Sequence, residues 1–190
     1  MELDLKQIND IDLSELGDII TQQEFKQYFI SDGGREHYKL LAYFSTLFEN
    51  EILLDIGTYK GCSSLALSYN TSNQVKSFDL GDYKRISKNL DNIDYILGDF
   101  TNDEYKDMLM QSPLIMLDTD HEGPFEHKAY QYLKDIEWKG YLLLDDIHLN
   151  DPMKEFWNQI DNEKYDITSM GHWSGTGLVI FRNSYKLLYK

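Results

Sequence analysis

Four aspartates follow two apolar stretches of the sequence. Asp118 and Asp120 come after the run Leu114–Leu117 in "LIMLDTDHEG", and Asp145 and Asp146 come after three leucines in "LLLDDIHL". Carboxylates crowded together raise one another's pKa values, which destabilises the protein unless a cation compensates their charge. Ligation by oxygen atoms alone favours Mg²⁺, Mn²⁺ or Ca²⁺ over zinc. The pattern therefore predicts a divalent-metal site, with the alternative that one or two aspartates, Asp146 above all, cap the helices that follow.

An earlier apolar run ends next to two glycines. In "ILLDIGTYKGCSS", Asp55 closes the run Ile52–Ile56, and Gly57 and Gly61 precede a predicted helix. Glycines permit a tight turn and let the backbone approach a ligand closely. The spacing D-x-G-x-x-x-G differs from the G-x-G-x-x-G of dinucleotide-binding folds, which disfavours a nicotinamide oxidoreductase.

Two further apolar runs also end in acidic residues. "VKSFDL" ends on Asp79, where a carboxylate can bind the two hydroxyls of a ribose. "ILGDF" places Asp99 and Phe100 where a purine ring could be held by a hydrogen bond and an apolar wall. In an open α/β sheet, ligands bind beyond the carboxyl ends of the strands. Three successive strand ends thus carry an aspartate in the order that a nucleoside requires.

Apolar runs alternate with helix-length segments, which predicts a parallel sheet covered on both faces. Amphipathic helices are expected at Phe125–Trp138 and at Pro152–Ile160, the second capped by Asp151. "YDITSM" and "GLVIFR" are joined too tightly for a helical crossover, so an antiparallel hairpin is expected at the sheet's edge. The predicted parallel strands are Ile52–Ile56, Val75–Phe78, Tyr95–Leu97, Leu114–Leu117 and Tyr141–Leu144.

Residues 1–50 are predicted to form an N-terminal helical extension. One helix is expected over Ser14–Ile30, and another has a single apolar face that includes His37 and Phe48. The break "SDGG" separates the two helices. The predicted fold is a single α/β domain, with a doubly wound, mostly parallel sheet in residues 51–190.

Composition narrows the classes of partner. The 190 residues carry a formal net charge of −15, and such a surface repels nucleic acids and anionic membranes. No signal peptide or apolar run of membrane-spanning length is evident, so a cytoplasmic protein is expected. Cys62, the one cysteine, has no partner for an internal disulfide and is expected to pack beside the glycine turn.

The acidic strand ends and the glycine turn together resemble the class I S-adenosylmethionine-dependent methyltransferases. The resemblance spans about Glu51 to the C-terminus, and it implies a Rossmann-like fold and S-adenosyl-L-methionine as cofactor. It places Asp79 at the ribose, and Asp99 with Phe100 at the adenine. The full set of cofactor-binding residues that it implies is Asp55, Gly57, Thr58, Gly61, Ser63, Asp79, Asp99 and Phe100.

The pattern D-x-D followed by D-D resembles the metal-dependent sugar O-methyltransferases of macrolide and aminocoumarin pathways. This resemblance implies Mg²⁺ or Mn²⁺ held by Asp118, Asp145 and Asp146, with Asp120 as the general base. His121 is the alternative base. The expected acceptor is a small hydroxylated molecule, a sugar or a glycoside. The oligomeric state is left open, and a homo-oligomer is one of the alternatives. Replacing one of the four crowded aspartates should relieve the repulsion among their carboxylates and leave the fold intact.

Two other classes of protein stay as alternatives. A haloacid-dehalogenase-like Mg²⁺-dependent phosphatase also has one strand ending in D-x-D and a later strand ending in D-D. The segment between Asp120 and Asp145 holds only one predicted helix, which leaves no room for the intervening Ser/Thr strand and Lys of that family. A non-catalytic module that binds the cofactor is the second alternative, and the intact set of aspartates argues against it.

Overall fold

A seven-stranded sheet forms the centre of the computed structural model, which describes residues 3–181. The strand order is β3-β2-β1-β4-β5-β7-β6. The first five strands along the chain run parallel, and β7 runs antiparallel to both of its neighbours. The strands are β1 (Ile52–Ile56), β2 (Gln74–Asp79), β3 (Ile93–Leu97), β4 (Leu114–Leu117), β5 (Gly140–Asp145), β6 (Glu163–Asp166) and β7 (Thr176–Phe181).

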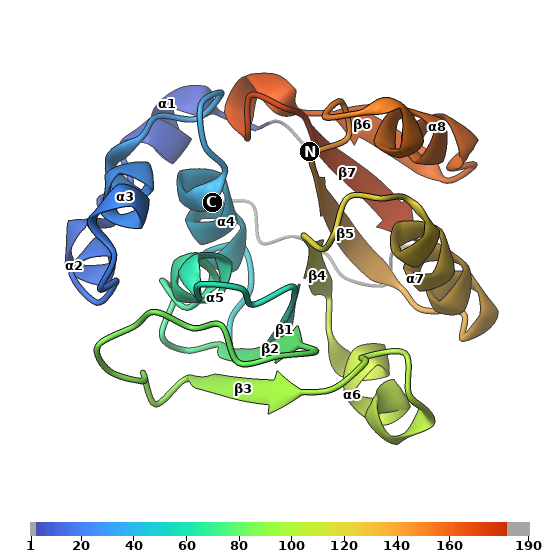
Figure 1. The fold of residues 1–190 in the computed structure, drawn as a ribbon, viewed down its shortest axis with the longest axis horizontal. Helices are drawn as coiled ribbons and strands as arrows, with labels where there is room; N and C mark the ends of the chain where they lie inside the picture. Colours follow the sequence, from blue (N-terminus) through green and yellow to red (C-terminus); the bar gives the residue numbers. More distant parts are fainter. Residues whose placement is uncertain (1–2, 182–190) are drawn as a thin grey trace.

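Helices cover both faces of the sheet (Figure 1). On one face lie α1 (Leu5–Asn9), α2 (Ser14–Gly17), α3 (Gln23–Lys26), the 3₁₀ helix η1 (Gln27–Ile30), α4 (Tyr38–Ser45) and α5 (Cys62–Leu67). On the other lie α6 (Lys106–Gln111), α7 (Pro124–Asp135) and α8 (Asp151–Gln159). Two further 3₁₀ helices are η2 (Asp103–Tyr105) and η3 (Thr168–Met170). The predicted doubly wound, mostly parallel α/β fold with an antiparallel C-terminal hairpin is confirmed. None of the described helices is both long and apolar enough to span a bilayer.

β1 and β4 have the bounds predicted from the sequence, because both are buried on both faces. Leu53 and Leu114 belong to the core on the side of the N-terminal helices, whereas Leu54 and Ile115 belong to the core on the opposite side. All four side chains are fully buried. Adjacent strand residues thus enter different cores, which explains why these strands are continuous apolar runs instead of alternating ones.

The single helix predicted over Ser14–Ile30 is wrong. This segment forms two short helices and a 3₁₀ turn, α2, α3 and η1. Between α2 and α3 the chain extends, and Ile20 forms a β-bridge with Ile86. A Cβ added to Gly17 would lie 3.1 Å from Cβ of Phe29, so the segment folds back closely on itself. Tertiary pairing with a distant loop therefore overrides the local helical pattern.

Three other local predictions are corrected. The connection between β2 and β3 contains no helix; Ser87 in it donates to the backbone oxygen of Ile19 at 2.8 Å. Strand β6 ends at Asp166, before most of the predicted stretch "YDITSM", and η3 follows it. The cap of α8 is Asn150, not Asp151, because the Asn150 side chain accepts a hydrogen bond from the Met153 N–H. Arg182, predicted to end the last strand, lies outside the described residues.

Candidate active site

A pocket of about 470 Å³ opens beyond the carboxyl ends of β1 to β4. A volume in this range is typical of small-molecule sites. The predicted residues that line it are Gly57, Asp79, Asp99, Phe100, Asp118, Asp120 and His121. Phe78, Phe125 and Tyr83 add apolar surface to the wall. The structure therefore brings the predicted nucleoside residues and part of the predicted catalytic set into one cavity.

Four predicted cofactor residues, Asp55, Thr58, Gly61 and Ser63, do not line this pocket. They hold the turn after β1 instead. Thr58 Oγ1 lies 2.6 Å from Ser77 Oγ, and the N–H of Gly61 donates to the backbone oxygen of Thr58 at 2.7 Å. Direct cofactor contact by these four residues stays a prediction.

Gly57 is required by the neighbouring strand. Its φ is 104°, and an added Cβ would lie 1.6 Å from the backbone oxygen of Asp118. The glycine thus lets the turn after β1 pass directly beside the end of β4. This close approach sets the position of Asp118, which links the glycine turn to the predicted metal site.

Asp79 is oriented by the backbone around it. Its Oδ2 accepts a hydrogen bond from the Tyr59 N–H at 2.8 Å, and its Oδ1 accepts from the Gly81 N–H at 3.1 Å. Each oxygen keeps a further lone pair, which suits two neighbouring hydroxyls. The carboxylate of Asp99 has more hydrogen-bond partners than that of Asp79. Lys128 Nζ lies 2.6 Å from its Oδ2, and both the N–H and Oγ1 of Thr101 donate to its Oδ1.

Replacing Asp79 by Asn should weaken cofactor binding about 10- to 100-fold, because a charge-assisted hydrogen bond contributes about 1.5–3 kcal/mol. The amide oxygen can still accept one of the two backbone N–H groups, so the melting temperature without ligand should change little. Calorimetric titration with S-adenosylhomocysteine measures the loss. Asp94→Asn, on β3 and outside the pocket, is the control. Equal affinity in Asp79→Asn and the parent protein would reject a ribose-binding role.

Asp55 is a fully buried carboxyl group beneath the pocket. Ser77 Oγ donates to its Oδ2 at 2.6 Å, and its Oδ1 has no hydrogen-bond partner within residues 3–181. Burial raises the pKa of Asp55 to about 7, against the opposing effect of its hydrogen bonds with Ser77 and Ser63. The folded protein therefore favours the protonated carboxyl group.

This raised pKa predicts that Asp55→Asn stabilises the protein at alkaline pH. The stabilising contribution of protonated Asp55 is complete below pH 3.8 and is lost as the pH rises towards 7, which corresponds to about 4 kcal/mol at most. The gain from Asn should therefore grow between pH 5 and pH 8. Urea unfolding of both proteins at these pH values measures it, and a difference that does not change with pH would contradict the assignment.

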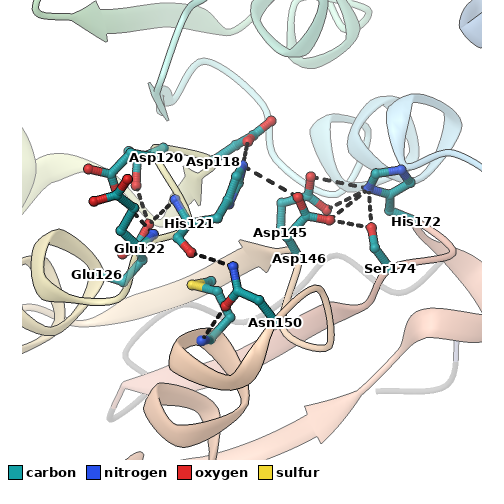
Figure 2. Close-up of polar contacts among 12 residues, drawn as sticks. Asp118, Asp120, His121, Glu122, Glu126, Asp145, Asp146, Asn150, His172 and Ser174 are labelled. Carbon is teal, nitrogen blue, oxygen red and sulfur yellow. Dashed lines mark hydrogen bonds and ion pairs between the residues drawn. The ribbon is translucent and has the colours of Figure 1, made fainter.

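Asp145 and Asp146 direct their carboxylates to the same side of the chain (Figure 2). Successive strand residues normally face opposite sides, but Asp146 has a φ of 59°, in the left-handed region. Nδ1 of His172 consequently lies 3.3 Å from a carboxylate oxygen of each aspartate. The turn of the backbone thus brings both carboxylates to one partner, while binding of a metal ion by them stays a prediction.

Three histidines lie among the predicted metal ligands. His37 Nδ1 is 3.2 Å from Asp145 Oδ1. His121 Nε2 is 3.2 Å from Asp118 Oδ1 and 3.4 Å from Asp146 Oδ2. We call the following six residues the histidine–carboxylate cluster: His37, His121, His172, Asp118, Asp145 and Asp146.

The cluster reverses the electrostatics expected from four crowded carboxylates. Burial lowers the pKa of His37, but the hydrogen bond with Asp145 and the charges of Asp145, Glu36 and Asp118 together outweigh burial and raise it to about 9. His172 is affected in the same way, by Asp145 and Asp146, and its pKa rises to about 10. Burial raises the pKa of Asp145, yet His37 and His172 lower it well below its usual range. The pKa of Asp118, by contrast, is raised by partial removal of its carboxyl group from water and by the charge of Asp145.

The loop after β4 is fixed by Glu126 of α7. One carboxylate oxygen accepts from Thr119 Oγ1 at 2.6 Å and from the His121 N–H at 3.0 Å, and the other accepts from the Gly123 N–H at 2.9 Å. Asn150 donates to the backbone oxygen of His121 at 2.9 Å (Figure 2). Neither Glu126 nor Asn150 is among the residues predicted from the sequence, although "GPFE" carries a glutamate at the capping-box position of a helix.

Asp120 lies apart from the cluster. It lines the pocket and is exposed, and its Oδ1 accepts a hydrogen bond from the Glu122 N–H at 3.2 Å. Its proposed role as general base thus depends on reaching an acceptor inside the pocket, and it stays a prediction.

Ser174, His172 and Asp145 do not form a nucleophilic triad. Both the Ser174 hydroxyl, at 2.9 Å, and the Asp145 carboxylate, at 3.3 Å, contact the same nitrogen of His172, Nδ1. A relay requires the two ring nitrogens to face different partners. Cys62 is also unsuited to nucleophilic chemistry, because burial raises the pKa of its thiol to about 12.

Solved structures that include methyltransferases share this fold. The S-adenosylhomocysteine-bound methyltransferase PaMTH1 of Podospora anserina is 14% identical with a TM-score of 0.57, over 77% of this chain and 78% of that chain. Cofactor-bound Rv0187 from MTB is 15% identical with a TM-score of 0.55, over 77% and 80%. A Geobacter sulfurreducens methyltransferase is 12% identical with a TM-score of 0.54, over 84% and 86%. No protein-family model matches the sequence, and a search of curated proteins gives no match either. At these identities the similarity shows a shared fold.

Proposed function

We propose that the protein is an S-adenosylmethionine-dependent O-methyltransferase assisted by a divalent metal ion. One observation carries the proposal: a single pocket runs from Asp79 and Asp99 to Asp118, so that a nucleoside site and the histidine–carboxylate cluster adjoin. The fold shared with the S-adenosylhomocysteine-bound methyltransferase PaMTH1 supports this reading of the pocket. The alternative of a haloacid-dehalogenase-like phosphatase does not explain the part of the pocket that contains Asp79 and Asp99.

The residues of the pocket have separate roles in this proposal. Asp79 binds the ribose hydroxyls, and the wall of Phe78, Phe100 and Phe125 holds the adenine. The metal is assigned to the cluster, whose carboxylate oxygens and imidazole nitrogens would serve as ligands once the histidines release their protons. When bound, such an ion lowers the pKa of an acceptor hydroxyl and orients its oxygen.

Proton transfer is assigned to the rim of the pocket. Asp120 is the proposed general base, since it is exposed and its carboxylate accepts only a backbone hydrogen bond among the described contacts. His121 is less suited to this role in the metal-free protein. Burial lowers its pKa, but its hydrogen bond to Asp118 and the charges of Asp118, Asp146 and Asp145 together raise it to about 9, so it is already protonated at neutral pH.

The proposed acceptor is a small hydroxylated molecule, a sugar or a glycoside. Trp173 is 69% exposed, and its ring centre lies 5.7 Å from that of His172, which offers a flat apolar face beside the cluster. No nucleic acid, membrane or protein partner is required by this proposal.

Methyl transfer from labelled S-adenosylmethionine to a panel of sugars, glycosides and catechols tests the proposed function. Each acceptor is assayed with and without EDTA, followed by repletion with Mg²⁺ or Mn²⁺. Product that disappears on chelation and returns on repletion is expected. Transfer that is undiminished after complete chelation would reject the metal, and the lack of transfer to every acceptor class would reject the choice of acceptor.

A further inference from the structure

The histidine–carboxylate cluster contains more than the three predicted carboxylate ligands. Among the described residues, Asp118, Asp145 and Asp146 do not form a group whose ligand atoms all lie within 4.8 Å of one another. Three groups that do each include at least one histidine. They are His37 with Asp118 and Asp145; His172 with Asp145 and Asp146; and Glu36 with His37 and His172.

The nitrogen–oxygen distances in the cluster are longer than those of ordinary charged hydrogen bonds. His37–Asp145 and His121–Asp118 are 3.2 Å, and the contacts of His172 are 3.3 Å. A hydrogen bond between an imidazolium and a carboxylate is about 2.7–2.9 Å long. The surface pair His148–Asp166, at 2.8 Å, shows that ordinary length in the same molecule.

Distances of this size suit two ligands of one ion. Nitrogen and oxygen ligands lie about 2.0–2.2 Å from a first-row metal ion, so neighbouring ligand atoms lie about 3.0–3.5 Å apart. The distance between His37 Nδ1 and Asp145 Oδ1, 3.2 Å, falls in this range, so the two atoms can belong to one coordination shell without rearrangement.

His37 is a preorganised donor in the cluster. It is 2% exposed, and its Nδ1 faces Asp145 and Glu36 with no hydroxyl or backbone partner among the described contacts. Its Nε2 is buried and without a hydrogen-bond partner in the described part of the chain. A hydrogen bond of 2.8 Å from the Gly34 N–H to the backbone oxygen of Gly171 holds the segment before α4 against the hairpin loop.

Nδ1 of His172 has more polar partners than Nδ1 of His37. Its Nδ1 contacts Ser174 Oγ as well as both aspartates, and neither Asp145 nor Asp146 lines the pocket. Asp118 does line the pocket. The group of His37, Asp118 and Asp145 is thus the one that borders the cofactor site.

We propose that His37, Asp118 and Asp145 bind a transition-metal ion through one imidazole and two carboxylates, with His172 positioning Asp145. This inference rests on the proposed function and narrows its metal from Mg²⁺ to an ion that accepts nitrogen. Imidazole suits Fe²⁺, Co²⁺, Ni²⁺ and Zn²⁺, whereas Mg²⁺ demands oxygen ligands and retains its waters. The N-terminal segment then contributes a ligand to the site as well as helices to the core.

Binding of metal alone to the full chain tests the inference. Calorimetric titration should show Co²⁺ binding at least about 100-fold more tightly than Mg²⁺. His37→Gln should lower Co²⁺ affinity at least 10-fold and change Mg²⁺ affinity less. His148→Gln, which removes the surface histidine of the ordinary pair, should leave both affinities unchanged. Pulsed electron paramagnetic resonance of the Mn²⁺-loaded parent protein should show coupling to an imidazole nitrogen, a readout that needs no variant.

Two results would overturn the inference. If Mg²⁺ and Co²⁺ bind equally well and no nitrogen coupling is seen, the site uses oxygen ligands alone, and the metal-assisted methyltransferase proposal stands. If no divalent ion binds, the inference fails together with the metal assistance. Titration of the same samples with S-adenosylhomocysteine separates both outcomes from a failure to bind the cofactor.

Discussion

Asp145→Asn is expected to reduce methyl transfer by about 10³-fold or more while leaving cofactor affinity within a few-fold of the parent protein. Asp145 contacts both His37 and His172, so its loss removes the residue that connects the two groups of candidate ligands. A metal ion supplies several kcal/mol of transition-state stabilisation, and each 1.36 kcal/mol is a factor of ten in rate. Asp145 does not line the pocket, which is why cofactor binding should survive.

The stability of Asp145→Asn should fall. Relief of carboxylate repulsion was the expectation from sequence, but His37 and His172 lower the pKa of Asp145 and make it their counter-charge. Removing one partner of a buried ion pair typically costs about 3–5 kcal/mol, and deprotonation of the histidines reduces that cost. Asp166→Asn, which disrupts the surface pair with His148, is the matched control for both measurements. Full activity in Asp145→Asn would rule out a role for the cluster in catalysis.

Gly57→Ala should lower the free energy of unfolding by more than about 3 kcal/mol and abolish cofactor binding. The new Cβ would overlap the backbone oxygen of Asp118 at 1.6 Å, and a φ of 104° is itself strained for alanine. Because backbone atoms cannot rotate away, either the turn after β1 or the end of β4 must move. Both line the pocket, so the displacement should reach the cofactor site.

A second variant, Gly61→Ala, separates the effect of backbone strain from the effect of the overlap with Asp118. Its φ is 89°, but the nearest atom to an added Cβ is Cγ2 of Ile86 at 3.2 Å, at the end of a side chain. A loss of only about 1–2 kcal/mol is expected there, from the left-handed backbone alone. Urea unfolding and cofactor titration of both variants make the comparison. Similar losses in the two variants would show that contact with Asp118 does not explain Gly57.

The central strands could be predicted because β1, β4 and β5 are buried on both faces. Ile52–Ile56 and Leu114–Leu117 are continuous apolar runs that end at carboxylates, and they agree with β1 and β4. Helix prediction was less successful where tertiary contacts decide the conformation. The bridge between Ile20 and Ile86 interrupts a segment with a helical pattern, and nothing local in the sequence reveals that pairing.

The aspartates of the candidate site were found because each one ends a predicted strand. His37 and His172 were not, because burial on a helical face and a position in a short loop are ordinary for histidine. They join the site through long-range packing: His37 precedes α4, and His172 lies between η3 and β7. Their contacts with Asp145 change its electrostatics from repulsion to attraction, which a pattern of carboxylates alone cannot show.

Native mass spectrometry of the full chain with S-adenosylhomocysteine tests the central claim most directly, because it requires neither an acceptor nor a metal. The account predicts a single adduct with the mass of one ligand, retained in Asp94→Asn and weakened in Asp79→Asn. The absence of an adduct from the parent protein at a large molar excess of ligand, with no heat in a calorimetric titration, would contradict the assignment of the pocket.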